Sequence, residues 1–223
     1  MTLKLYFAPG ACSFVPHALL ETTGEPFEPV LVKLHKGENL TAQYKALNPR
    51  GQVPVLVDDG EVITQIVAIV SHLDARFPQC NFLPREPLAR TRVLETLAWM
   101  NNSVHPTFTH VFMPHKFTDD APAQAKIKTF NAALYRTMLD ELEALAGKAA
   151  AQGRPYLGGA QFGPLDAYAL TLLRWGGFAG HDPQDFGALW ALVQRVAQLP
   201  AVARAIERER LQLNVYQPAT GRA

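Results

Sequence analysis

The sequence predicts an α/β domain followed by an all-helical region, and three observations lead to this expectation. Strand and helix patterns succeed one another over roughly the first 80 residues in the order β-α-β-α-β-β-α. Pro78, Pro84 and Pro87 then crowd one short segment, which is typical of a linker. Beyond this segment the strand patterning stops, and apolar residues recur every three or four positions. We therefore expect one domain over residues 1–80 and an all-helical domain over residues 88–223.

Turn residues divide the first region into its elements. Pro9-Gly10 ends the first strand, Gly24 closes the first helix, and Asp58-Asp59-Gly60 predicts a tight hairpin. Alternation of apolar and polar residues predicts strands over 3–7, 28–34, 53–57 and 61–63. Helical spacing predicts helices over 13–22, 41–47 and 65–77.

The second region is expected to contain two long helices and three shorter ones. Apolar residues at helical spacing place the long helices over 93–111 and 127–145, and the shorter ones near 165–175, 186–199 and 201–209. Pro106 lies inside the first long helix and lacks the N–H that the helix needs there. We therefore expect a kink at Pro106, with its orientation toward or away from a cleft left open.

The composition excludes several classes of protein. Lys and Arg total 21 and Asp and Glu total 20, and this net charge of +1 argues against a nucleic-acid surface. The start of the chain has no basic segment followed by a long apolar run, so no secretory signal is expected. No apolar stretch is long enough to span a membrane. Two cysteines make no disulfide framework and fit a reducing cytoplasm, so we expect a cytoplasmic globular protein.

Cys12 is the residue most suggestive of chemistry. It follows the first strand and Pro9-Gly10-Ala11, and it lies where the first helix is expected to start. Free N–H groups and the helix dipole favour an anion there, so we expect a lowered pKa for this thiol. The alternative is a small buried apolar side chain, as free cysteines often are. No second cysteine follows at Cys-x-x-Cys spacing, so intramolecular dithiol chemistry is excluded.

Three weaker signals lie in the same region. Pro54 opens an apparent central strand, which either an edge strand or a cis Val53–Pro54 bond would explain. A cis bond would turn the Val53 backbone outward to pair with an extended peptide. The predicted helix that begins at Gln65 presents free N–H groups suited to a carboxylate. Lys36, in a Lys-Gly-Glu-Asn loop, could pair with a second carboxylate.

Three segments of the sequence are distinctive in combination. They are residues 6–13 (Tyr-Phe-Ala-Pro-Gly-Ala-Cys-Ser, with Pro16-His17 after them), residues 48–56 (Asn-Pro-Arg-Gly-Gln-Val-Pro-Val-Leu), and residues 165–175 from Leu-Asp-Ala-Tyr to Leu-Arg-Trp. In this order, and over nearly the whole chain, they resemble the bacterial beta-class glutathione S-transferases. The second segment is similar to that family's Asn-Pro-Lys-Gly-Gln-Val-Pro.

The resemblance implies a fold and an activity. It implies a thioredoxin-like domain over residues 1–80 that binds glutathione, an all-helical domain over 88–223 that shapes an electrophile pocket, and a homodimer. The implied activity is detoxification, in which the glutathione thiolate attacks a small electrophile without a metal. Glutathione-dependent thiol–disulfide exchange through Cys12 is implied as a second activity.

The resemblance also implies a role for individual residues. Cys12 would lie beside the glutathione sulfur, and His105 would reach toward it from the long helix; these two are the implied catalytic residues. Lys36 would hold the glycyl carboxylate, and Val53 would pair with the cysteinyl backbone before a cis Pro54. The implied glutathione-binding residues are Cys12, Lys36, Val53, Pro54, Gln65, Ile66, Asn102, Ser103 and His105. The implied pocket residues are Phe14, Phe108, Phe112 and Trp175.

The sequence departs from the family pattern at three places. Gln65-Ile66 stands where the family often has Glu followed by Ser or Gly, so we expect glutathione binding weaker by about 1–2 kcal/mol. Ala98 stands seven residues before His105, where the family commonly has Asn. Gly163 replaces the usual Ser or Thr cap three residues before the buried Asp166, which we expect to be structural and mild.

Two hypotheses from different classes follow. The first is the glutathione-conjugating enzyme, and the alternative is a non-catalytic protein that binds glutathione or apolar ligands on the same fold. Cys12, Lys36 and Val53-Pro54 favour the enzyme, whereas the altered Gln65-Ile66 pair favours the alternative. A metal site is rejected, because His105, His110 and His115 are five residues apart and would not share one face of a helix.

Overall fold

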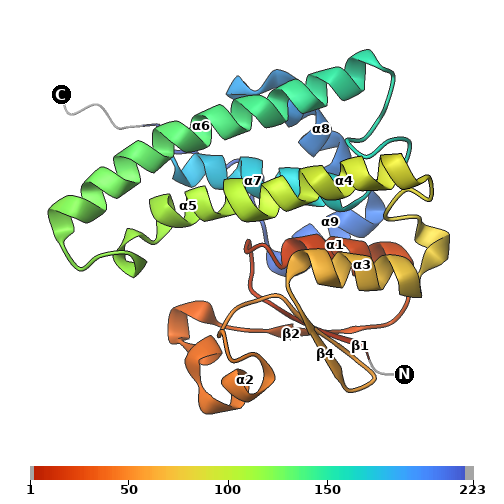
Figure 1. The fold of residues 1–223 in the computed structure, drawn as a ribbon, viewed down its shortest axis with the longest axis horizontal. Coiled ribbons are helices and arrows are strands. Elements are labelled where there is room, and N and C mark those ends of the chain that lie inside the picture. The colour runs from red at the N-terminus through yellow and green to blue at the C-terminus, as the bar shows by residue number, and fades with distance from the viewer. Residues whose placement is uncertain (1–2, 219–223) are drawn as a thin grey trace.

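The computed structural model describes residues 3–218, so residues 1–2 and 219–223 of the two expected domains lie outside the described residues (Figure 1). A small sheet with three helices is followed by helices alone, which confirms the expected α/β plus all-helical architecture. The strands are β1 (Leu3–Phe7), β2 (Glu28–Leu31), β3 (Val55–Asp58) and β4 (Glu61–Thr64). The helices are α1 (Phe14–Thr23), α2 (Ala42–Leu47), α3 (Ile66–Arg76), α4 (Pro87–Trp99), α5 (His105–Phe112), α6 (Ala121–Ala151), α7 (Pro164–Phe178), α8 (Gly187–Ala197) and α9 (Pro200–Glu209).

The sheet has the strand order β2-β1-β3-β4. Strand β2 runs parallel to β1, with α1 as the crossover between them, whereas β3 and β4 form an antiparallel hairpin beside β1. Along β1, Leu3, Leu5 and Phe7 are buried, and they alternate with half-buried Lys4 and Tyr6. This alternation turns one face of the sheet toward the main core and the other toward α2.

Helix α1 connects the sheet to the helical region. In Figure 1, α1 and α3 lie between the sheet and the layer that contains α4, α5 and α7. Helix α1 packs against α3 and also against α7 and α9, so one apolar core runs through both parts of the chain. Within residues 3–218, no helix combines the length and the apolar character needed to cross a bilayer.

The long helix expected over 93–111 is interrupted rather than simply kinked. A π-helical turn over Met100–Val104 separates α4 from α5, and the N–H of His105 donates to the carbonyl of Met100, five residues earlier. Pro106 follows this turn as the second residue of α5. The π-turn changes the hydrogen-bond pattern directly before Pro106, which has no N–H to donate.

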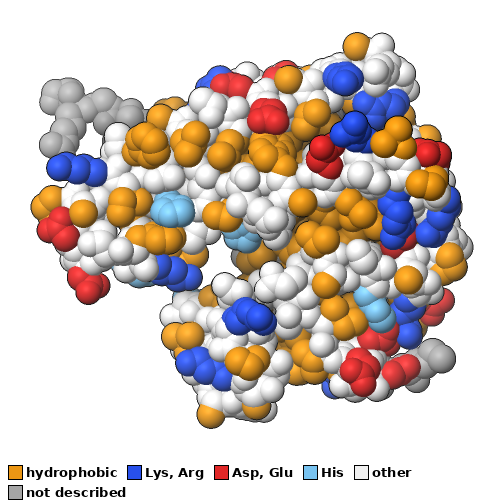
Figure 2. Space-filling model, viewed as in Figure 1, with side chains coloured by type: hydrophobic (Ala, Val, Ile, Leu, Met, Phe, Trp, Pro, Cys, Tyr) orange, Lys and Arg blue, Asp and Glu red, His pale blue; other side chains and the backbone are white. Residues whose placement is uncertain are grey.

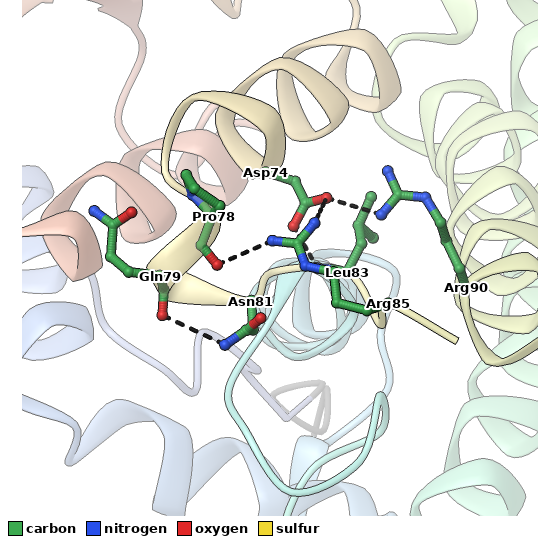
Figure 3. Close-up of polar contacts among 7 residues, drawn as sticks. All are labelled: Asp74, Pro78, Gln79, Asn81, Leu83, Arg85 and Arg90. Carbon is green, nitrogen blue, oxygen red and sulfur yellow. Dashed lines mark hydrogen bonds and ion pairs between the residues drawn. The ribbon is translucent and has the colours of Figure 1, made fainter. Parts of the chain in front are cut away.

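A buried carboxylate fastens the proline-rich segment between α3 and α4 (Figure 3). Asp74 of α3 is 1% exposed and accepts hydrogen bonds from the backbone N–H of Leu83 at 3.0 Å and from Arg90 at 2.8 Å. Arg85 donates to the same carboxylate at 3.0 Å and to the carbonyl of Pro78 at 3.0 Å. The expected linker is therefore an ordered connection tied to both helices.

Asp166 organises the start of the buried helix α7. Its carboxylate accepts hydrogen bonds from the N–H groups of Leu157 at 2.8 Å and Gly163 at 2.9 Å. Burial raises the pKa of Asp166 to about 7, although these backbone N–H groups oppose the shift. A Cβ at Gly163 would lie 3.2 Å from the carbonyl of Phe82, so glycine fits this cap by its small size.

Candidate active site

The loop between β1 and α1 presents Cys12. Ser13 closes this loop, because its hydroxyl accepts from the N–H of Ala8 at 3.1 Å and donates to the Ala8 carbonyl at 3.2 Å. Gly10 has φ of +69°, and a Cβ there would lie 2.7 Å from the guanidinium of Arg174. Position 10 therefore favours glycine for its backbone conformation, whereas the Arg174 contact involves only the end of a flexible side chain.

Two helices of the second region hold this loop in place. The carboxylate of Glu209, at the end of α9, accepts from the N–H of Gly10 at 2.8 Å and from Nδ1 of His17 at 2.7 Å. Trp175 of α7 donates from Nε1 to the Gly10 carbonyl at 2.8 Å. The contact between His17 and Glu209 could not be expected from sequence patterns, because 192 positions separate the two residues.

The thiol of Cys12 is protonated at neutral pH, which makes the expected lowering of its pKa wrong. Burial raises the pKa of Cys12 to about 12, the negative charge of Glu209 adds to this, and the N–H groups of Cys12 and Ser13 only partly oppose it. Cys12 is 8% exposed, and its Sγ donates to the Val53 carbonyl at 3.5 Å. Helix α1 begins two residues later, at Phe14, and burial is the larger effect.

The segment opposite Cys12 precedes β3 and contains a cis Val53–Pro54 bond. The carbonyl of Gln52 is held by Tyr44 Oη at 2.9 Å and by Asn48 Nδ2 at 2.8 Å. Val53 itself is half-buried and lies outside the paired residues of β3. The carbonyl of Val53 accordingly faces Cys12 instead of a neighbouring strand.

The remaining candidates from the first region lie on exposed positions or at a helix start. Lys36 is exposed and ends a short 3₁₀ turn over Leu34–Lys36. Gln65 immediately precedes α3 and has φ of +71°, a conformation that non-glycine residues rarely adopt. Its side chain is exposed, whereas Ile66, the first residue of α3, is 3% exposed. Ile66 can therefore offer a ligand its backbone N–H but not its side chain.

His105 stands at the start of α5 between two aromatic residues of α7. Its Nδ1 lies 2.8 Å from the hydroxyl of Tyr168, and its ring centroid lies 4.8 Å from that of Trp175. Burial lowers the pKa of His105 to about 4, and the positive charge of Lys116 adds to this shift. The imidazole is therefore neutral at neutral pH.

The expected pocket residues differ in how much of each residue is exposed to solvent. The ring of Phe108 is stacked between those of Trp175 and Phe112, with centroid-to-centroid distances of 4.6 Å and 5.5 Å. Trp175 and Phe108 are 6% and 5% exposed, whereas Phe112 is 56% exposed. Phe14 is fully buried in the core, which corrects the expectation that it lines a pocket.

The structure has a hollow on the face that Figure 2 shows, between the part that contains α2 and the end of α5. Hydrophobic, histidine and Lys or Arg side chains border this hollow (Figure 2). Of the residues expected one turn before His105, Asn102 is exposed and Ser103 is half-buried. Asn102 Oδ1 accepts from Asn101 Nδ2 at 2.9 Å.

Among residues 3–218, no three His, Cys, Asp or Glu side chains are grouped so that they could hold a metal ion.

Because the pKa of His105 is lowered in the folded chain, we expect the free energy of unfolding to decrease as the pH falls. The unfolded chain binds a proton near pH 6.5, whereas the folded chain binds it only near pH 4, so stability falls as the pH drops through this window. The full contribution is about 3 kcal/mol of unfolding free energy. Urea unfolding at several pH values is expected to show a shallower acid loss in His105→Gln than in the wild type.

The pH test depends on a difference between variants, because Asp166 acts in the opposite direction. Its pKa is raised from 3.8 to about 7, so its contribution grows as the pH falls through that window. Subtracting the His105→Gln curve from the wild-type curve removes the Asp166 contribution. His115→Gln, which changes an exposed histidine, serves as the control. Equal acid slopes for His105→Gln and the wild type would contradict the assignment.

Comparisons with known proteins identify the relatives of this chain. Residues 1–75 match the family described as glutathione S-transferase, N-terminal domain. The chain is 33% identical over 212 residues to glutathione S-transferase GstA of Escherichia coli O157:H7, covering 94% of this chain and 100% of GstA. The solved structure of a sphingomonad glutathione S-transferase complexed with glutathione is 31% identical in sequence to this chain, with a TM-score of 0.79. The solved structure of the bacterial beta-class glutathione S-transferase of Sphingomonas chungbukensis is 29% identical, with a TM-score of 0.80. Each covers 94% of this chain and 100% of the other, and these matches confirm the resemblance inferred from the sequence.

Proposed function

This chain belongs to the glutathione S-transferase family, and we propose that it joins the sulfur of glutathione to small hydrophobic electrophiles. One observation supports this function above the others. The thiol of Cys12 faces the carbonyl of Val53, next to a cis Pro54 and in a loop that α7 and α9 hold rigidly. That arrangement offers one peptide group for backbone pairing and one S–H group beside it.

We assign glutathione recognition to residues 1–80 and the electrophile pocket to residues 88–223. Lys36 pairs with the glycyl carboxylate, and the backbone of Val53, before Pro54, pairs with the cysteinyl residue. The N–H of Ile66 at the start of α3, with Gln65 before it, binds the γ-glutamyl carboxylate. Asn102 and Ser103 contact the ligand from the turn before His105. Phe112, Phe108 and Trp175 form the apolar wall.

Cys12 acts as a hydrogen-bond donor in this proposal. Because its pKa is raised to about 12, the side chain carries its proton at neutral pH and cannot serve as a base. When the backbone of glutathione pairs with the Val53 carbonyl, the S–H group is released to donate to the glutathione sulfur. A donor beside that sulfur stabilises its thiolate, which is the attacking species.

Thiol–disulfide exchange through Cys12 is the second activity. Attack by Cys12 on a glutathione-containing disulfide forms a Cys12–glutathione disulfide and releases the other thiol, and a second glutathione then reduces it. This route requires the Cys12 thiolate. Since burial raises the pKa of Cys12, we expect exchange to be slower than conjugation at neutral pH.

A non-catalytic glutathione-binding protein on the same fold is the second candidate. The uncharged Gln65, followed by a buried Ile66, favours it because the helix start offers neither a carboxylate nor a hydroxyl.

We also propose that the protein is a cytoplasmic homodimer. Val62 on the edge strand β4 and Leu88 on α4 are exposed apolar residues, at 44% and 62%, that an interface would cover.

The test combines binding with two turnover assays. The protein is expected to bind immobilised glutathione and to conjugate glutathione to an activated aryl halide, and to exchange more slowly with hydroxyethyl disulfide. Binding without either turnover would favour the non-catalytic protein. Failure to bind glutathione at all would reject both candidates.

A further inference from the structure

Arg174 lies on α7 beside the loop that presents Cys12. The residue is half-buried, and its Nε donates to the carbonyl of Gln212 at 2.8 Å. A Cβ built on Gly10 would lie 2.7 Å from Nη1 and 3.3 Å from Cζ of Arg174, so the guanidinium lies directly against this glycine. Gly10 stands two residues before Cys12, and its carbonyl accepts from the indole of Trp175, the next residue of α7. A positive charge therefore lies against the loop that carries the candidate catalytic thiol.

The end of this guanidinium that carries Nη1 and Nη2 is not used by the protein. Apart from its Nε bond, Arg174 makes no hydrogen bond or ion pair within the described part of the chain. The carboxylate of Glu209 also contacts Gly10, but its two oxygens accept from the Gly10 N–H and from His17. Charged groups that leave water are normally paired. Nη1 and Nη2 together match the two oxygens of a carboxylate, so this end of Arg174 is suited to an acidic ligand.

Exposed aromatic rings lead from the expected pocket wall to this guanidinium. Cζ of Arg174 lies 5.4 Å from the ring centroid of Phe178, and the Phe178 ring centroid lies 5.7 Å from that of Phe112. Phe178 is 45% exposed and Phe112 is 56% exposed, and the ring of Phe112 stacks on that of Phe108. Neighbouring exposed rings offer an apolar surface to a planar ligand. An aromatic ligand that carries a carboxylate would contact these phenylalanines and Arg174 together.

We propose that Arg174 is a specificity-determining residue that pairs with a carboxylate on the electrophile, so that the site prefers aromatic electrophiles that carry an acid group. This inference rests on the proposed function, in which the carboxylates of glutathione itself bind to Lys36 and to the N–H of Ile66. In the conjugation of an aryl halide, the glutathione thiolate forms the new S–C bond, the carbon–halogen bond breaks, and halide leaves with its electron pair. The carboxylate is unchanged by this reaction, and its contact with Arg174 holds the ring in place.

Two electrophiles that differ in a single group test this preference. They are 4-chloro-3,5-dinitrobenzoate, which carries a carboxylate, and 4-chloro-3,5-dinitrobenzamide, which carries a neutral amide at the same position. Each value of kcat/KM is divided by the rate constant of the uncatalysed reaction with glutathione, which removes the difference in intrinsic reactivity. We expect the wild type to favour the benzoate about tenfold. A wild type without this preference would overturn the proposal.

The ratio of the two electrophiles separates recognition by Arg174 from a structural role. Arg174→Gln is expected to abolish the preference, chiefly through a higher KM for the benzoate. Arg174→Lys keeps the charge without the paired donors and should retain part of the preference. Because Arg174 also packs against Gly10, a purely structural role would slow both electrophiles equally, and that result would overturn the proposal.

Arg154→Gln provides a matched control. Arg154 follows α6, is also half-buried, and donates to a backbone carbonyl, that of Leu157, at 2.8 Å. The variant removes an equal charge without touching the contact to Gly10, so the wild-type preference is expected. A loss of preference as large as in Arg174→Gln would assign the effect to overall charge and overturn the proposal.

Binding without turnover separates this inference from the proposed function. The probe 3,5-dinitrobenzoate has no chloride to lose, so isothermal titration calorimetry measures recognition of its carboxylate alone. We expect Arg174→Gln to weaken its binding about tenfold and to leave the binding of 3,5-dinitrobenzamide and of glutathione unchanged. If the protein binds the benzoate through Arg174 but conjugates neither electrophile, the proposed function fails and the role of Arg174 stands. No binding of the benzoate, equal binding in Arg174→Gln, or loss of glutathione binding in this variant would overturn the role of Arg174.

Discussion

Alanine in place of Cys12 is expected to lower conjugation at neutral pH about tenfold, because the variant loses the S–H donor beside the glutathione sulfur. A hydrogen bond to a charged group contributes about 1.5–3 kcal/mol, so its loss raises the pKa of the bound glutathione thiol by about one unit or more. Exchange through Cys12 is expected to fall to the uncatalysed rate. The measurements are a pH titration of the bound thiolate by its ultraviolet absorbance and the two turnover assays.

Two further variants define the role of Cys12. Cys12→Ser keeps a hydroxyl donor and is expected to retain conjugation while losing exchange. Cys80→Ala removes the only other cysteine of the chain, which is half-buried, and is expected to retain both activities. An unchanged pKa of the bound thiol in Cys12→Ala would contradict the donor role.

Glu209→Ala is expected to produce the largest loss of stability. It removes the acceptor of both the Gly10 N–H and the His17 ring, and Glu209 is 3% exposed and His17 fully buried. Leaving each of these two donors without its acceptor costs about 1–3 kcal/mol of unfolding free energy, against a typical total of about 5–15 kcal/mol. Because the Cys12 loop loses its tie to α9, conjugation should also fall. Urea unfolding and the conjugation assay measure the two effects.

The neighbouring Glu207 makes the comparison specific. Glu207 lies on the same helix with an exposed side chain, so Glu207→Ala removes an equal charge without breaking the contact to the loop. We expect its stability within about 0.5 kcal/mol of the wild type. Glu209→Gln keeps one amide oxygen as an acceptor and should lose less than Glu209→Ala. If Glu209→Ala were as stable as Glu207→Ala, the carboxylate would have no part in holding the loop.

The sequence predicted the element order well because local patterns determine it. Gly24 adopts the left-handed conformation that ends α1, and Asp59-Gly60 turns the hairpin between β3 and β4 as expected. We expected a kink at Pro106, and the structure has a π-turn directly before this residue. The π-turn that precedes Pro106 was not predicted, because a single residue does not specify how the helix accommodates it.

The electrostatics of the site could not be predicted because they depend on burial and on distant residues. The expectation for Cys12 considered only the helix dipole, whereas its pKa is set first by burial and further raised by Glu209, 197 positions along the chain. Tyr168 was part of a recognised motif, but its contact with His105 spans 63 positions. Such contacts follow from tertiary packing and not from spacing.

The central claim is that the glutathione sulfur binds between Cys12, the carbonyl of Val53 and His105. A crystal structure of the protein with glutathione tests it most directly. The account predicts the sulfur within hydrogen-bond distance of Cys12 Sγ, the cysteinyl backbone paired with Val53, and His105 beside the sulfur. A sulfur bound elsewhere, with Cys12 still donating to the Val53 carbonyl, would contradict it.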